Sequence, residues 1–167
     1  LIGGGAVWSL ISIDKETRTI YFSTGSSPGV IDAALRPGPN LYASSVIALE
    51  VDTGKMKWYH QIAPHDINDH EIGWSVILGE IEIDGQRKKA IMAGSKTDHV
   101  FVLDALSGQL LHEPLRLGNQ AFNVPNDNAG NNADLRISQK TLVGKTFCPG
   151  GNGGIEHAGA FASNTLF

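Results

Sequence analysis

Asp69 and Glu71 are two carboxylates only two residues apart, and such a pair suits cation binding or proton transfer. In an extended segment alternate side chains point the same way, so both would lie on one side of the chain. Hard cations prefer oxygen ligands, which paired carboxylates supply. For Glu71, an ordinary solvated position in a loop is the alternative.

His65, Asp66 and His70 flank this pair and raise the alternative of a transition-metal cluster. Their spacing matches none of the strong zinc patterns, so we give this interpretation less weight. Cys148 is the single cysteine, so no internal disulfide can form, and no His/Asn arrangement marks it as a nucleophile. A buried, small apolar role is the simpler prediction for Cys148.

Trp8 and Lys96 are the other residues with chemical interest. Trp8 follows three glycines, Gly3 to Gly5, which would let the backbone approach a flat ligand closely. A core or docking tryptophan is the alternative. Lys96 opens the segment Lys-Thr-Asp-His-Val-Phe-Val-Leu-Asp, and for it an exposed hairpin lysine is the alternative.

The composition narrows the class of protein that positions these residues. Of 167 residues, 41% are apolar and 18% charged. We find no apolar run near the roughly 18 residues of a membrane helix, and expect no transmembrane segment. With 13 basic and 17 acidic residues the net charge is −4, which argues against nucleic-acid binding. Twenty glycines indicate many tight turns, and so an all-β chain.

Short apolar runs bounded by Gly, Pro, Asn and Asp predict paired strands rather than helices. The predicted pairs are 8–13 with 19–23, 45–50 with 56–60, 75–83 with 88–92, and 100–103 with 109–111. Residues 144–147 and 160–167 are the last strand candidates, and 119–134 is predicted to be a long loop.

One pattern occurs twice. The segment from Ala48 to Trp58 is echoed by the segment from Val102 to His112, with Gly54 and Gly108 at matching places. Each unit would be a strand, a Thr/Ser-Gly turn and a second strand. Two similar hairpins by chance are the alternative, but one hairpin per blade of a β-propeller explains the spacing better. Trp58 would then dock between neighbouring blades.

The pattern Ala-x-x-x-Asp-Thr-Gly-x-x-x-Trp at 48–58 resembles the tryptophan-docking motif of quinoprotein alcohol dehydrogenases, which are eight-bladed propellers. Further segments resemble this family in the same order, at 3–8, 23–28 with 36–42, 64–69, 96–104 and 148–157. The resemblance covers essentially the whole chain. It implies an all-β partial propeller of about three four-stranded antiparallel blades. Residues 1–167 would be a fragment of that single domain, and both chain ends are expected to be internal cuts.

The resemblance also implies an activity, the oxidation of an alcohol or similar hydroxyl compound with pyrroloquinoline quinone (PQQ) as cofactor. Asp69 matches the family's base, which takes the substrate proton while a hydride moves to the quinone C5. Lys96 matches a cation that hydrogen-bonds the quinone oxygens and polarises that carbonyl. Trp8 matches the aromatic floor under the quinone, and Glu156 a residue at the cofactor rim.

A Ca²⁺ or lanthanide ion is implied beside the cofactor, with Ser26, Asp69 and Glu71 as its ligands. An acidic residue at the place of Glu71 is associated in the family with lanthanide use. The chain departs from the family at three positions. Ser26 stands where an asparagine ligand is usual, while Asn68 and His157 stand where tryptophans are usual. At the first of these, Ser26 or Ser27 could ligate, or water could take the place, or metal binding could be impaired.

The implied partners are a cytochrome c or quinone electron acceptor and the remaining propeller blades, in the periplasm or outside the cell. A non-catalytic propeller scaffold of the same repeat family is the main alternative. Ser26 and Asn68 favour it, while the presence of Asp69, Lys96 and Trp8 together disfavours it. A carbohydrate-binding β-protein is a weaker alternative, which rests on the Asn- and Gly-rich loop alone.

Overall fold

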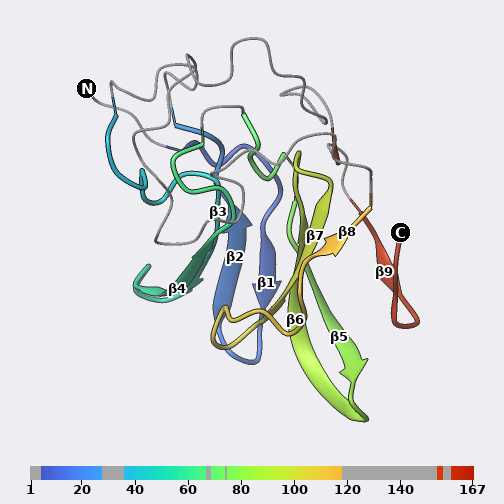
Figure 1. The fold of residues 1–167 in the computed structure, drawn as a ribbon. Helices are drawn as coiled ribbons and strands as arrows, with labels where there is room; N and C mark the ends of the chain where they lie inside the picture. Colours follow the sequence, from blue (N-terminus) through green and yellow to red (C-terminus); the bar gives the residue numbers. More distant parts are fainter. Residues whose placement is uncertain (1–4, 28–35, 67–68, 74, 118–153, 156–158) are drawn as a thin grey trace.

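The computed structural model describes residues 5–27, 36–66, 69–73, 75–117, 154–155 and 159–167. It consists of antiparallel strands, most of them in two four-stranded sheets (Figure 1). The first sheet contains β1 (Ser12–Asp14), β2 (Thr19–Ser23), β3 (Ser45–Glu50) and β4 (Met56–Gln61), in that order. The second contains β5 (Ile77–Ile83), β6 (Gln86–Gly94), β7 (His99–Asp104) and β8 (Leu115–Arg116). A separate hairpin follows, β9 (Phe161–Ala162) and β10 (Thr165–Leu166).

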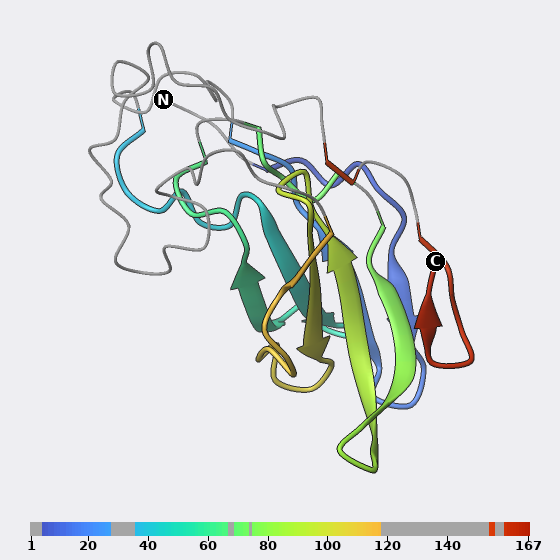
Figure 2. The ribbon, with the colours of Figure 1, turned by 45° about the vertical axis from the view of Figure 1, so that its right-hand side comes forward.

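This arrangement confirms the all-β expectation of antiparallel four-stranded units. Each sheet pairs sequential strands, as a propeller blade does. The β9–β10 hairpin packs on the second sheet, where Phe161 lies against Gly79 (Figure 2). The predicted strand 144–147 and loop 119–134 lie outside the described residues. The described part has no helix that is long and apolar enough to cross a membrane.

The predicted strand at 109–111 is wrong in its extent. Only one bridge forms there, between Leu103 and Leu110, and the fourth strand of the sheet is β8. Pro114 lies between these two stretches, and proline cannot donate to a strand ladder. The first predicted strand is also shorter than expected, since β1 begins only at Ser12.

Trp58 connects the two sheets through a hydrogen bond and a packing contact. Its side chain is 8% exposed, and its indole Nε1 donates a 3.0 Å hydrogen bond to the carbonyl oxygen of Ala105, in the turn that follows β7 of the second sheet. The Tyr21 hydroxyl donates to the same oxygen at 3.1 Å, and its ring lies 5.8 Å from that of Trp58. Gly108 lies directly against the indole, at a φ of +71°. The predicted docking of Trp58 is therefore confirmed.

The hydrophobic core is shared between the sheets. Its residues come from both, so neither sheet buries its apolar face alone. They are Tyr21, Val46, Ala48, Trp58, Ile62, Ala63, Ile72, Val76, Ile91, Ala93, Phe101, Leu103 and Ala105.

An ion pair adds to this interface. Lys89 on β6 donates to both Asp14 oxygens, at 2.9 and 3.0 Å, and to Glu16 at 2.7 Å. Asp14 is buried and also accepts from the backbone N–H of Glu16 and the hydroxyl of Thr17. Burial alone would raise the Asp14 pKa, but these donors outweigh it and the pKa is lowered.

We expect Gly108→Ala to loosen the contact between the sheets. A Cβ there would lie 2.5 Å from a ring carbon of Trp58. The matched control is Gly85→Ala, because Gly85 has the same kind of φ, +72°, with nothing within 4 Å of its Cβ position. Both changes carry a left-handed backbone cost of about 1–2 kcal/mol. Gly108→Ala should lose about 1–3 kcal/mol more in urea unfolding, and equal losses would contradict the docking contact.

Asp14→Asn should weaken the protein in a pH-dependent way. Because the folded pKa of Asp14 is lowered, its stabilisation is present above the unfolded value of 3.8 and is lost as pH falls through the folded pKa. The variant should lose about 1–3 kcal/mol at pH 7, where the carboxylate accepts charged hydrogen bonds, and less as pH falls below about 4. Urea unfolding from pH 3 to 7 measures this. Asp52→Asn, in the exposed pair with Arg18, is the control and should change little.

Candidate active site

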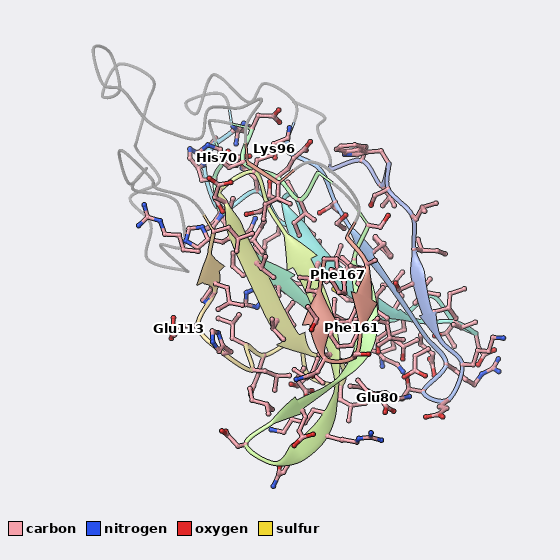
Figure 3. All side chains as sticks on the ribbon, turned by 90° about the vertical axis from the view of Figure 1, so that its right-hand side faces the viewer. His70, Glu80, Lys96, Glu113, Phe161 and Phe167 are labelled. Carbon is pink, nitrogen blue, oxygen red and sulfur yellow. The ribbon has the colours of Figure 1, made fainter. Side chains whose placement is uncertain are left out.

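Three connecting segments meet at one end of the two sheets. They are the loop after β2, the segment between β4 and β5 that carries Asp66 to Glu71, and the turn between β6 and β7 that carries Lys96. Figure 3 shows Lys96 and His70 together at this end, away from Glu80 on β5. Side chains far apart in the sequence are therefore brought into one site.

Lys96 is the centre of this site. Its Nζ donates to Asp69 Oδ2 at 2.8 Å and to Glu71 Oε1 at 3.3 Å. Lys96 and Glu71 are each only 8% exposed, whereas the Asp69 side chain is 38% exposed. The solvated alternatives for Lys96 and Glu71 are therefore wrong, and Asp69 is the carboxylate of this group that solvent reaches.

The two carboxylates keep the buried lysine charged. Burial lowers the Lys96 pKa, but the hydrogen bonds and negative charges of Asp69 and Glu71 outweigh it, so the pKa is raised. The main chain supports the same grouping, since the Lys96 N–H donates to the carbonyl oxygen of Glu71 at 3.1 Å. Asp69 itself has a φ of +63°, a conformation that Asp tolerates better than most residues.

Ser26 joins the site through its backbone and its hydroxyl. The backbone N–H donates to Glu71 Oε2, and the hydroxyl donates to Asp66 Oδ2 at 2.7 Å. The Ser44 hydroxyl donates to the same Asp66 oxygen at 3.5 Å. Both oxygens of Glu71 are thus in use, one by Ser26 and the other by Lys96.

Trp8 lies at the edge of the site and is 55% exposed, so the buried-tryptophan alternative is wrong for this residue. The absence of a side chain at Gly25 allows the Trp8 indole to lie against the main chain at that position. A Cβ on Gly25 would lie 2.8 Å from Trp8 Nε1 and 2.6 Å from Glu71 Oε2, so a side chain at this position would collide with both. The Gly25 N–H donates to the carbonyl oxygen of Ala6 at 2.9 Å, which ties the two segments together.

His65 and His70, which lie beside the site, are both buried. His65 forms a 2.7 Å hydrogen bond between its Nδ1 and the carbonyl oxygen of Gly38. Among the described residues, no three His, Cys, Asp or Glu side chains gather as a metal-binding group. Asp69 and Glu71 are joined through Lys96, whereas the Ser26 hydroxyl bonds Asp66. Glu156 lies outside the described residues.

Gly25 contributes to this site without being identifiable from the sequence, and Asp66, which the sequence offers only as a transition-metal ligand, orients the Ser26 hydroxyl instead. The sequence signal at Gly25 is a glycine within a run of small residues, Ser23 to Ser27, which is compatible with close packing but does not name a partner. Asp66 has the same residue type as Asp69, and only the fold separates the residue that orients Ser26 from the exposed carboxylate.

Comparison with known proteins defines the class. Residues 2–127 match the sequence model of the PQQ family, described as the glucose/ethanol/alcohol dehydrogenase β-propeller domain. The chain is 36% identical over 65% of its length to the quinohemoprotein alcohol dehydrogenase ADH IIB of Pseudomonas putida, 16% of which is covered. It is 29% identical over 98% of its length to the lanthanide-dependent methanol dehydrogenase of Methylacidiphilum fumariolicum, 27% of which is covered.

Comparison with solved structures leads to the same family as the sequence comparisons. The quinohemoprotein alcohol dehydrogenase ADHIIG from Pseudomonas putida HK5 superposes on 98% of this chain with a TM-score of 0.82 and 26% identity, over 25% of its own length. A europium-containing methanol dehydrogenase covers 75% of this chain with a TM-score of 0.67 and 27% identity, over 22% of its own length. The chain therefore belongs to the PQQ dehydrogenase β-propeller family. It spans about a sixth to a quarter of the lengths of these relatives.

We expect Glu71→Gln to destabilise the protein in the absence of metal and cofactor. It removes the negative charge that Lys96 and the Ser26 N–H both use, at a site that excludes most water. The loss should be about 1–3 kcal/mol in urea unfolding. Glu80→Gln on the exposed side of β5 is the matched control, with less than about 0.5 kcal/mol expected. Equal effects would show that Glu71 is not structurally engaged.

Proposed function

We propose that the whole protein is a PQQ-dependent oxidoreductase that oxidises an alcohol or a similar hydroxyl compound. The observation that carries the proposal is Lys96, which lies between buried Glu71 and the more exposed Asp69. Burying an ammonium group has a desolvation cost that a scaffold has no reason to bear. The grouping therefore favours the enzyme over a non-catalytic propeller.

The residues present fit the cofactor and its ion. Because Gly25 has no side chain, Trp8 Nε1 and Glu71 Oε2 can both lie close to its main chain, where a Cβ would be only 2.8 and 2.6 Å from them. The donor set of Asp69, Glu71 and Ser26 is made of hard oxygens, which suit Ca²⁺ or a lanthanide. When bound, PQQ supplies the two-electron acceptor that the side chains of the chain lack.

Asp69 is the proposed base. Its Oδ2 accepts the bond from Lys96, while its Oδ1 has no hydrogen bond to a described residue. With the side chain 38% exposed, this carboxylate can accept the proton of a substrate hydroxyl. Lys96 remains protonated beside it, because the two carboxylates raise its pKa. Lys96 thus provides a fixed positive charge for cofactor oxygens.

Trp8 provides a flat apolar surface for a planar ring, and Glu156 is proposed for the cofactor rim. Ser26 donates its hydroxyl proton to Asp66, which leaves the lone pairs of its oxygen for a cation. Glu71 and Asp69 would complete the oxygen ligands. The lanthanide-dependent relative makes a trivalent ion a candidate alongside Ca²⁺.

The whole protein would need more than this chain. We propose that residues 1–167 are a segment of a longer propeller, since they span about a quarter of a related structure. The names of the quinohemoprotein relatives support a cytochrome-type electron acceptor, with a quinone as the other candidate. The periplasm or the cell exterior is the proposed location.

The whole protein loaded with PQQ and either Ca²⁺ or a light lanthanide should reduce an artificial electron acceptor when a primary alcohol is added. Asp69→Asn should lower turnover by about 10²–10⁴-fold while the bound cofactor keeps its absorbance. Asp84→Asn is the matched control, because Asp84 also has a positive φ, +52°, but lies in the β5–β6 turn. No PQQ binding with any of these ions would exclude the proposed function, and full turnover of Asp69→Asn would exclude Asp69 as the base.

A further inference from the structure

The main chain of Lys96 is in close contact with a segment nearly sixty residues further along the sequence. Gly154 has a φ of +81°, and a Cβ there would lie 2.3 Å from the Lys96 carbonyl oxygen and 2.6 Å from its Cα. These are main-chain atoms, which cannot rotate away as the end of a flexible side chain can. Only glycine therefore permits this approach.

A hydrogen bond fixes the same contact. The N–H of Ile155 donates to the carbonyl oxygen of Ser95 at 3.2 Å. On the Glu71 side, the Lys96 N–H donates to the Glu71 carbonyl oxygen at 3.1 Å. The turn that carries Lys96 is thus held both by the segment with the carboxylates and by Gly154 with Ile155. Ser95 is fully buried in this arrangement.

The position of this turn decides what the lysine can reach. A lysine side chain is a flexible four-carbon stem with a point charge at its end, so it has little geometry of its own. The placement of the Cα therefore sets the region that the Nζ can reach, and in this structure the Nζ lies 2.8 Å from Asp69 and 3.3 Å from Glu71. Displacements of about 1 Å can cost about 10²-fold in catalysis.

We infer that Gly154 is a positioning residue for Lys96, because its lack of a side chain lets the main chain at 154–155 hold Lys96 between Asp69 and Glu71. The catalytic consequence of this role rests on the proposed function. The positioning itself does not, and can be measured without cofactor.

Acetylation of lysine amines, followed by mass spectrometry of the whole protein free of metal and cofactor, tests the positioning. In the wild type, Lys96 should react slowly relative to exposed Lys15 and Lys55. Gly154→Ala should speed the reaction of Lys96 by about fivefold or more, since a displaced turn opens locally. Gly85→Ala, with a similar φ and an open Cβ position, should leave it unchanged.

An unchanged rate at Lys96 in a folded Gly154→Ala protein would overturn the inference, as would equal acceleration at Lys96, Lys15 and Lys55. If Gly154→Ala does not fold, Ile155→Pro takes its place, because it removes the hydrogen bond to Ser95 and keeps glycine at position 154. Ile155→Pro should speed the acetylation of Lys96 about twofold, because the turn that carries Lys96 would open locally more often. No change in that variant would also overturn the inference.

A double-mutant cycle with PQQ and Ca²⁺ then tests the consequence. Gly154→Ala should weaken PQQ binding about tenfold, the value of one hydrogen bond to a charged group, and should add nothing in a Lys96→Ala background. Equal weakening in both backgrounds would overturn a role through Lys96. If Lys96→Ala leaves PQQ affinity unchanged, the proposed role of Lys96 fails, and the acetylation rates still decide the positioning.

Discussion

The candidate site depends on one interaction, a lysine ammonium placed out of water between two carboxylates. Burial would push Lys96 towards its neutral form, and Asp69 and Glu71 together reverse that tendency. Such a group tolerates little error, because a buried charge without its partners is costly. Both carboxylates come from the segment between the sheets, while the lysine comes from a turn of the second sheet. The site therefore requires that the sheets and the connecting segment keep fixed relative positions.

The contacts between the two sheets hold them in fixed relative positions. Trp58 crosses from the first sheet to bond Ala105 and lie on Gly108, and Lys89 reaches back from the second sheet to Asp14. These contacts combine a large buried aromatic surface with directional hydrogen bonds, so they fix both distance and orientation. The two sheets lie side by side, as Figures 1 and 2 show. The framework and the site are thus linked, although they share few residues.

The predictable part of this arrangement is local in sequence. Most of the strand pairs and the docking of Trp58 follow from alternation, turn residues and a repeat. Asp69 and Glu71 do meet at one group, Lys96, but Asp69 has a φ of +63° and not the extended conformation from which their common side is predicted. The prediction of a strand at 109–111 is wrong in its extent, because the apolar pattern there suits a strand while Pro114 interrupts the pairing before β8. Burial of Lys96 could not be read from its surroundings, since a lysine in a hairpin turn is usually exposed. The contacts of Gly25 and Gly154 join segments far apart in the chain, and no local pattern records which main chain will approach a glycine.

The same geometry constrains how a cation would bind in the proposed holoprotein. Glu71 already accepts from Lys96 on one oxygen and from the Ser26 N–H on the other, so an ion using Glu71 must share or replace a donor. Asp69 has an oxygen without a described partner and is more exposed, so it offers a ligand at lower cost. The competition at Glu71 is electrostatic, and a higher ionic charge favours the ion over an N–H donor. The bond from the Ser26 hydroxyl to Asp66 fixes the direction in which the lone pairs of its oxygen point. In the proposed holoprotein, the choice of ion would therefore depend on how Glu71 and Ser26 are already bonded, as much as on the number of oxygens present.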